Sequence, residues 1–198
     1  MKRPFTHQAK RAGIALAAVA ALSALGIGAA QAQSFVTADL SVNSVGFLEC
    51  AFKETGLIPG ATINYTCAAT DVGWVTQCFI RNKPVSNIAP KLHVAHAADG
   101  LVTMQGRKAT NRGTVTSAIL TAYPTVEEQP GTEPLCPEVE GQTITEEITA
   151  IRWCNASLVD TTNNITGATV PELFRSLTQK GAGNVPGCAT LAGLPTDI

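Results

Sequence analysis

Six cysteines constrain this 198-residue chain more than any other feature, and all of them follow a long apolar N-terminal run. They are Cys50, Cys67, Cys78, Cys136, Cys154 and Cys188. An even number of cysteines in an exported chain is typical of disulfide bonds, which staple small domains. Six cysteines can pair in many ways, so the residues around each cysteine must indicate the connectivity.

The first 32 residues have the three-part layout of a secretory signal peptide. Four basic residues come first, the apolar run AGIALAAVAALSALGIGAA follows, and Ala30-Gln31-Ala32 supplies an A-x-A cleavage pattern. We therefore expect cleavage before Gln33, secretion to the extracellular space or periplasm, and no stable membrane insertion afterwards. The same run is long enough to span a bilayer, so a retained anchor is the alternative.

The charge of the chain bears on its partners. Cleavage removes four of the 14 Lys and Arg residues and none of the 15 Asp and Glu residues, which leaves a net charge of −5. An acidic chain without a basic cluster argues against nucleic acid as a partner. We expect an extracellular protein or a surface ligand instead, and the sequence leaves the oligomeric state open.

Short β-like runs recur after residue 33 and are separated by turn signals such as GLIPG, NKPVSNIAP, ADG and TNRG. The expected strands are 35–42, 45–53, 62–70, 73–80, 91–97, 101–107, 114–122, 143–154 and 156–160. This spacing predicts a mainly β fold, an immunoglobulin-like antiparallel β-sandwich over residues 33–168. The Pro- and Glu-rich stretch 123–142 is expected to be a surface loop that contains Cys136.

One segment near the end of the chain predicts a helix. In TVPELFRSLTQKG, residues 169–181, Thr169 and Glu172 have capping-box spacing and Pro171 lies in the first turn. Four apolar side chains fall on one helical face, namely Val170, Leu173, Phe174 and Leu177. We therefore expect residues 169–198 to form a helical C-terminal extension packed on the sandwich.

The first two cysteine-containing runs can be placed in register as a β-hairpin. FLECAF and TINYTCAA flank the turn GLIPG, and pairing them places Cys50 opposite Cys67 and Phe52 opposite Tyr65. Because side chains alternate at period 2, these four side chains share one face of the sheet. Cross-strand neighbours lie near the separation that a disulfide requires, so we predict a Cys50–Cys67 bond.

LECAFKETGL, QCFIRN, LCPE and LVDTTNN together resemble a pattern in a family of small secreted bacterial β-sandwich proteins with no assigned activity. The resemblance covers residues 45–167 and implies a Cys78–Cys136 bond, but no catalytic residue. The chain departs from the pattern by having Cys67, Cys154 and Cys188, and by its C-terminal helix. Cys154 and Cys188 are then left as the third pair, which would staple the C-terminal extension to the sandwich.

A nucleophilic Cys154 is the alternative to a disulfide in the stretch IRWCNASLVDTTNN. A cysteine nucleophile needs a base, usually histidine, and only His93 and His96 follow the signal sequence. Nothing in the sequence connects either histidine with Cys154, so a disulfide is preferred. We expect Ile151 and Trp153 to face the core, which places Cys154 on the other side of its strand.

The two histidines of LHVAH could also suggest a metal site. They are three residues apart, so on a strand they point to opposite faces, which argues against a shared ion. We interpret them as ordinary residues of a strand that ends in a hairpin at Asp99-Gly100.

Two groups of polar residues could suggest a calcium site or a glycosidase. Asp160, Thr162 and Asn164 are spaced as in a calcium loop, but the glycine and glutamate that complete such a loop are missing, so a tight polar turn is preferred. A glycosidase needs two carboxylates across a cleft. The glutamates of loop 123–142 are interpreted as solvated, and Glu146 and Glu147 point to opposite faces of a strand; the loop residues are Glu127, Glu128, Glu133, Glu138 and Glu140.

The sequence contains no G-x-S-x-G elbow, phosphate-binding glycine loop or C-x-x-C pair. We therefore expect a secreted, disulfide-stapled, non-enzymatic domain for extracellular binding or surface structure, with no catalytic, cofactor-binding or metal-binding residue and no cofactor. The alternative is a secreted hydrolase, or a hydrolase inhibitor that acts through loop 123–142. A surface subunit that polymerises is a third hypothesis, which an unpaired, uncharged edge strand would favour.

Overall fold

The structure, a computed structural model, describes residues 32–124, 136, 141–178 and 183–196. The described residues all belong to one compact unit, Gln31–Ile198. Its strands are β1 (Ser34–Val42), β2 (Leu48–Thr55), β3 (Thr62–Ala68), β4 (Asp71–Ile80), β5 (Lys83–Pro84), β6 (Lys91–His96), β7 (Val102–Lys108), β8 (Val115–Thr121), β9 (Ile144–Asp160) and β10 (Ile165–Ser176). A 3-10 turn, η1 (Ala97–Asp99), and one short helix, α1 (Cys188–Leu191), complete the described part, in which no helix is long and apolar enough to cross a membrane.

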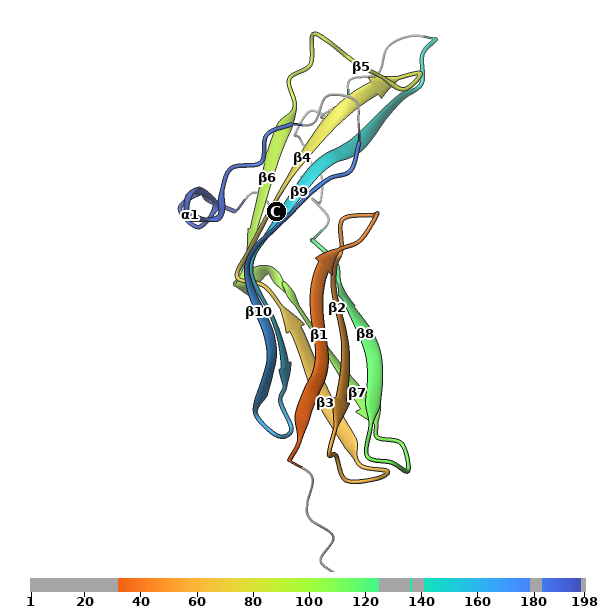
Figure 1. Cartoon of the computed structure of the whole chain (residues 1–198). Helices are drawn as coiled ribbons and strands as arrows, with labels where there is room; N and C mark the ends of the chain where they lie inside the picture. Colours follow the sequence, from red (N-terminus) through yellow and green to blue (C-terminus); the bar gives the residue numbers. More distant parts are fainter. Residues whose placement is uncertain (1–31, 125–135, 137–140, 179–182, 197–198) are drawn as a thin grey trace, which may run out of the picture. The chain divides into compact units, whose positions relative to one another are not determined.

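The strands form two antiparallel sheets (Figure 1). Sheet A has the order β1-β2-β8. Sheet B has the order β5-β4-β9-β3-β7, with β6 paired to β4 and β10 paired to β9. The inward side chains of both sheets form one apolar core, so the expectation of a mainly β sandwich with one short helix is confirmed. The nine expected β-runs all fall on strands, although 143–154 and 156–160 belong to the single strand β9.

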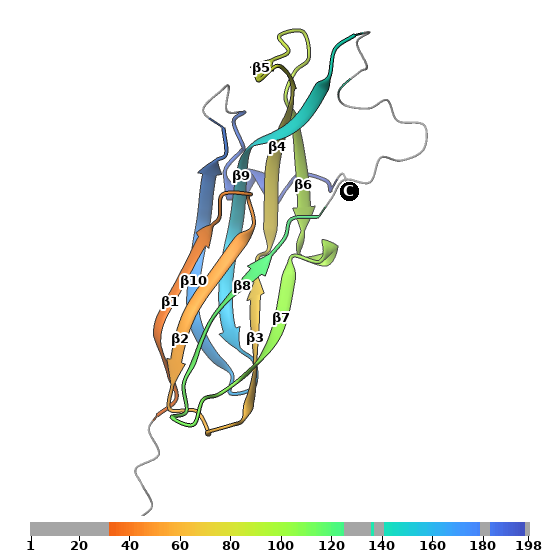
Figure 2. The ribbon, with the colours of Figure 1, turned by 90° about the vertical axis from the view of Figure 1, so that its right-hand side faces the viewer.

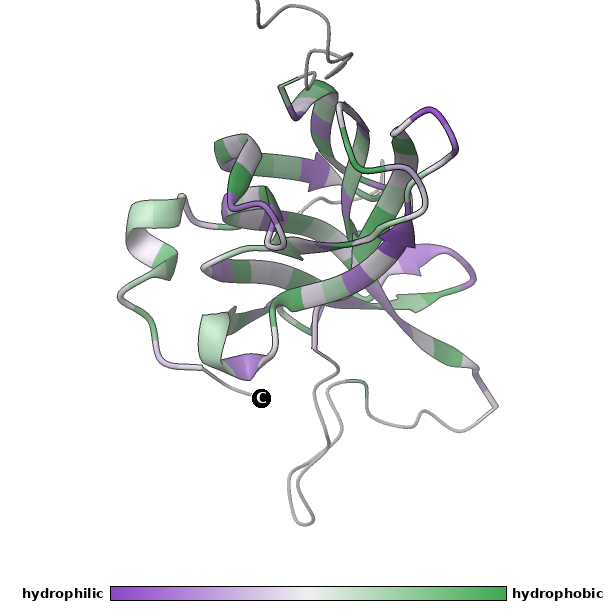
Figure 3. Cartoon of the chain, turned by 90° about the horizontal axis from the view of Figure 1, so that it is seen from below, coloured by the Kyte–Doolittle hydropathy of each residue, from purple (hydrophilic) through white to green (hydrophobic). Residues whose placement is uncertain are grey.

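Alternation along the strands builds this core. Leu48, Cys50 and Phe52 of β2 are buried, and so are Tyr65 and Cys67 of β3. Residues between them are more exposed, and Figure 3 shows hydrophobic and hydrophilic residues alternating along single strands. Period-2 alternation therefore assigns each of these side chains to the correct face.

The Cys50–Cys67 bond forms, but the predicted hairpin between its two strands is wrong. β2 pairs with β1 and β8 in sheet A, whereas β3 pairs with β7 and β9 in sheet B. The disulfide therefore joins the two sheets across the core, and Phe52 and Tyr65 meet there with ring centroids 4.4 Å apart. Two inward faces of packed sheets bring side chains together as closely as two strands of one sheet do.

Sheet B is built on the long strand β9. β3 and β4 follow each other along one edge of β9 in a single register, because Tyr65 lies opposite Asp160 and Asp71 lies opposite Cys154. Figure 2 shows β9 beside β4 in its first half and beside β3 in its second half. β6 and β7 continue this arrangement on the next edge, since β6 pairs with β4 and β7 pairs with β3. The hairpin expected at Asp99-Gly100 is therefore wrong.

The strands of sheet B are interrupted at one level, which we call the crease. The interruptions lie at residues 69–70, between β3 and β4, and at 97–101, between β6 and β7, while the continuous strands β9 and β10 pass the same level at Asn155 and Pro171. Asn155 has a φ of 48°, in the left-handed region that asparagine tolerates. On β3 the side chains that face the core belong to odd-numbered residues, Tyr65 and Cys67. On β4, beyond the crease, they belong to even-numbered residues, Val72 and Trp74.

The helix expected over 169–181 is wrong for the described residues, because 165–176 form strand β10. Its pairing with β9 places Leu173 and Phe174 on opposite faces, where a helix would have placed them together. Pro171 is tolerated because β10 is an edge strand, and it lies opposite Asn155, whose backbone has a positive φ. Pairing with a long neighbouring strand overrides the local helix signals.

The C-terminal segment 183–196, which contains α1, covers the outer face of sheet B on the β4 side of the crease (Figure 1). Val185 and Leu191 are buried there against Val75, Val94 and Ala150. Gly73 leaves room for this contact, since a Cβ at that position would meet a Leu191 methyl at 2.6 Å. β4 is thus covered on both faces and is buried from Asp71 to Phe79.

Candidate functional site

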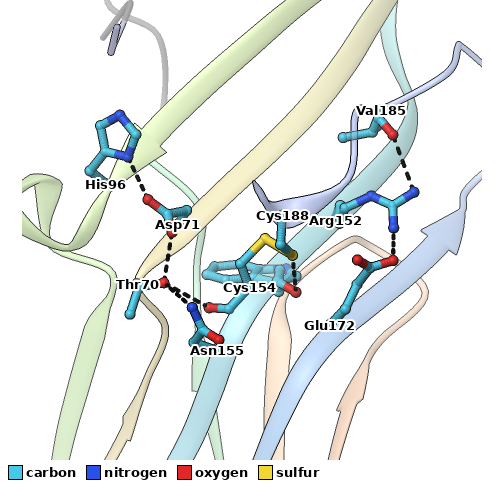
Figure 4. Close-up of a disulfide and its surroundings, with 10 residues drawn as sticks. Thr70, Asp71, His96, Arg152, Cys154, Asn155, Glu172, Val185 and Cys188 are labelled. Atoms are coloured by element: carbon cyan, nitrogen blue, oxygen red, sulfur yellow. Dashed lines mark hydrogen bonds and ion pairs between the residues drawn. A yellow bond between two sulfur atoms is a disulfide. The ribbon is translucent and has the colours of Figure 1, made fainter. Parts of the chain in front are cut away.

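Polar side chains from three strands meet at the crease (Figure 4). Thr70 and Asp71 lie where β3 gives way to β4, His96 ends β6, and Asn155 of β9 lies opposite the gap between β3 and β4. Asn155 Nδ2 donates to Thr70 Oγ1 at 2.9 Å, and Thr70 Oγ1 donates to Asp71 Oδ2 at 2.7 Å. This chain of hydrogen bonds continues into His96, which contacts Asp71 Oδ1 through Nδ1 at 2.6 Å.

Both ring nitrogens of His96 face acceptors. Nδ1 faces the Asp71 carboxylate, and Nε2 faces the backbone carbonyl of Leu194 at 2.8 Å. A histidine can donate from both nitrogens only as the imidazolium cation. The hydrogen bond to Asp71 raises the pKa of His96, and the bond to Leu194 acts in the same direction. Nε2 is the atom that a general base would turn toward a substrate, and here it holds the C-terminal segment.

His93 has a different environment. It is buried, its ring stacks on Trp74 with centroids 5.4 Å apart, and its Nε2 lies 3.0 Å from Thr76 Oγ1. His93 pairs with Trp74 and His96 pairs with Asp71, so the two histidines belong to opposite faces of the sheet, as expected.

Cys154 is bonded to Cys188, so its sulfur is half of a disulfide in this structure (Figure 4). Ile151 and Trp153 lie in the core between the sheets, and Cys154 lies on the other face, as predicted. The bond places Cys188 of α1 directly over β9. The structure also contains the Cys50–Cys67 and Cys78–Cys136 bonds, the same three pairs that the sequence and the resemblance had indicated.

Arg152 supports the same C-terminal segment. Its guanidinium pairs with Glu172 of β10, lies 4.7 Å from the centroid of the Phe174 ring, and donates to the Val185 carbonyl at 3.2 Å. Glu172 therefore serves a cross-strand contact rather than a helix cap. Thr196 Oγ1 adds a bond of 3.3 Å to the Val94 carbonyl.

Protonation of His96 should control how firmly this segment is held. Asp71 and Asp99 are the charged groups that face His96, and both raise its pKa above 6.5. The bond to Leu194 is therefore complete below that value, and it weakens as the pH rises through the raised pKa and one donor is lost. We expect elastase to cleave the segment at Ala189 or Ala192 faster at pH 9 than at pH 5.

The matched control for this experiment is His96→Gln, which keeps one donor but does not titrate. Its cleavage rate, normalised to a peptide substrate at each pH, should be independent of pH. Equal pH dependence in the wild type and in the variant would contradict a role of His96 in holding the segment.

A second polar cluster lies inside the sandwich on the β3 side of the crease. Glu54 of β2, Tyr65 of β3 and Asp160 of β9 are all fully buried, and Tyr65 donates to Glu54 Oε2 at 2.8 Å. Glu54 Oε1 has no hydrogen-bond partner among the described residues. Burial raises the pKa of Glu54 to about 7; the bond from Tyr65 opposes this shift and the Asp160 charge adds to it. The pKa of Tyr65 is raised as well, mainly by its burial.

The other polar residues that the sequence offered as candidates lie outside these two clusters or at their margin. Asp160 accepts hydrogen bonds from the backbone of Thr162 and Asn163, which confirms a polar turn between β9 and β10. Glu146 and Glu147 lie on adjacent positions of β9. Loop 123–142 lies outside the described residues except for 123–124, Cys136 and 141–142, and this holds for all five of its glutamates.

Sequence reasoning missed Glu54, Asp71 and the Thr70–Asn155 contact. A signal for Glu54 exists, because it continues the inward series Leu48, Cys50 and Phe52 at period 2. The crease has no such signal, since it depends on which strand lies beside β9. Comparisons with protein-family models, with curated proteins and with solved structures find no match for this chain.

Proposed function

We propose that the chain is a non-enzymatic, disulfide-stapled domain that is exported and acts in extracellular binding or surface structure. The observation that carries the proposal is that both described histidines form hydrogen bonds within the fold. His93 and His96 both bond to groups of the fold itself, to Thr76 in one case and to Asp71 and Leu194 in the other. A histidine base instead needs a ring nitrogen directed at the substrate.

The three disulfides support an oxidising compartment. They connect the two sheets, tie Cys136 to β4 and hold α1 on β9, so each one fastens a different part of the fold. Disulfides of this number are typical of extracellular and periplasmic domains. The signal peptide at 1–32, the bacterial origin and the resemblance to small secreted β-sandwich proteins are parts of the same proposal.

An immunoglobulin-like relationship also belongs to this proposal. A buried disulfide between the sheets and a buried tryptophan in the same core, Trp153, support it.

Purified, exported protein tests the proposal in two assays. Thiol titration of the denatured protein should find no free cysteine, and peptidase, esterase and glycosidase substrates should not be turned over above a mock purification. His93→Gln and His96→Gln serve as variants. A turnover that co-purifies with the wild type and is lost in either variant would overturn the non-enzymatic assignment.

A further inference from the structure

The outer edge of sheet A is formed by β8, residues VTSAILT. β8 pairs with β2 on one side, and the backbone groups on its other side have no hydrogen-bond partner among the described residues. β8 lies at the margin of sheet A, and its neighbour there is β7 of sheet B, which contacts it through side chains, with Arg107 Nε donating to Ser117 Oγ at 2.7 Å (Figure 2). Such an edge presents N–H and C=O groups to any extended chain that can align with it.

β8 also lacks the features that protect edges from pairing. Charged side chains and proline on an edge strand normally prevent the addition of another strand. Every other edge strand of the described part carries at least one of them: Asp39 in β1, Lys83 and Pro84 in β5, Lys91 in β6, Arg107 and Lys108 in β7, and Pro171, Glu172 and Arg175 in β10. β8 carries neither, and its Leu120 is 46% exposed.

We propose that two copies of this chain associate through β8, which pairs antiparallel with the β8 strand of the second copy to form a continuous six-stranded sheet. Antiparallel pairing of identical strands obeys two-fold symmetry, so the strand is its own complement. When the two-fold axis of the dimer passes through Ala118, Leu120 lies beside Thr116 of the second copy, which covers the exposed leucine side chain. This inference goes beyond the proposed function because it needs no ligand.

The charges on the neighbouring strand β2 are compatible with the antiparallel arrangement. On the outer face of sheet A, Glu49 of β2 lies opposite Leu120, and Lys53 lies opposite Thr116. Two-fold pairing therefore places Glu49 of one copy and Lys53 of the other in the same row across the new sheet. Two-fold pairing also closes the association at a dimer, because no uncharged edge remains in the described part.

Sedimentation velocity of the exported, oxidised protein over a range of concentrations tests this proposal. The wild type should shift from monomer to twice the monomer mass as concentration rises. Ala118→Lys should remain monomeric, because a charge at the symmetry axis meets its own copy. Ser41→Lys, which adds the same charge to exposed β1 of the same sheet, should behave as the wild type. A wild type that stays monomeric, or a dimer that survives in Ala118→Lys, would overturn the proposal.

The register is tested by a second pair of variants. The double substitution T116E/L120K places opposite charges where the two copies meet, and within each copy the new charges lie opposite Lys53 and Glu49, so its dimer should persist. T116K/L120K places like charges at the same positions and should be monomeric. Circular dichroism and thiol titration establish that each variant is folded and fully oxidised. Equal behaviour of the two double variants would exclude pairing about Ala118.

Discussion

Replacement of Cys50 and Cys67 by alanine should lower the free energy of unfolding by about 3 kcal/mol, the value that chain-entropy arguments give for a bond spanning 17 residues. Both sulfur atoms are fully buried between the sheets, so their removal also leaves unfilled space in the core. Denaturation followed by the fluorescence of Trp74 and Trp153, which are buried in the same core, measures the loss.

The matched control is the double variant C154A/C188A. Its bond spans 34 residues, for which the same entropy argument predicts about 4 kcal/mol. We expect a smaller loss, because this variant can release segment 183–196 and keep the sandwich, so the loss is limited to the free energy of docking the segment. Elastase sensitivity near α1 should rise. A larger loss of core stability in C154A/C188A than in C50A/C67A would contradict this division of roles.

The Cys50–Cys67 disulfide shows what an alternating pattern can and cannot predict. Alternation correctly placed Cys50 and Phe52 with Cys67 and Tyr65 on inward faces. It does not distinguish two neighbouring strands of one sheet from two strands that face each other across a core, because both bring side chains into contact. The pair was therefore correct and the hairpin was not.

The segment 169–176 shows a limit of a different kind. Its capping-box spacing and apolar periodicity are local signals for a helix, whereas its actual structure is set by the free edge of β9. β9 has 17 residues and needs a partner along both edges, and β10 supplies one from Ala150 to Asp160. Local propensity cannot reveal such a partner, and tertiary pairing overrides it.

The candidate site was predictable only in parts. Opposite facing of His93 and His96 follows from their spacing, but the contacts to Thr76, Asp71 and Leu194 depend on how β4 and the C-terminal segment are placed. The order of Thr70 and Asp71 along the chain does not indicate that Asn155 lies opposite them. That contact arises because β3 and β4 share one register along β9.

Glu54→Gln should stabilise the protein at neutral and alkaline pH. The pKa of Glu54 is about 7 in the folded protein, whereas that of a glutamate exposed to water is 4.5. Between these two values the unfolded chain loses a proton that the folded protein keeps, so the stability of the wild type falls as the pH rises. A shift of this size corresponds to about 3 kcal/mol. Gln keeps an acceptor for the Tyr65 hydroxyl and removes the ionisation.

Urea denaturation at pH 4 and pH 8 measures this effect. At pH 4, below both pKa values, Glu54 is mainly protonated in the folded and in the unfolded wild type. The wild type and the variant should therefore differ little in stability. At pH 8 the variant should be the more stable one, and the difference between the two pH values should be smaller in the variant. Glu49→Gln, on the outward face of the same strand, serves as the control and should follow the wild type.

A Glu54→Gln variant that is less stable than the wild type at pH 8 would show that the ionised carboxylate is accommodated in the core. Since Glu54 lies beside Asp160 and receives one hydrogen bond, from Tyr65, the structure favours the neutral acid.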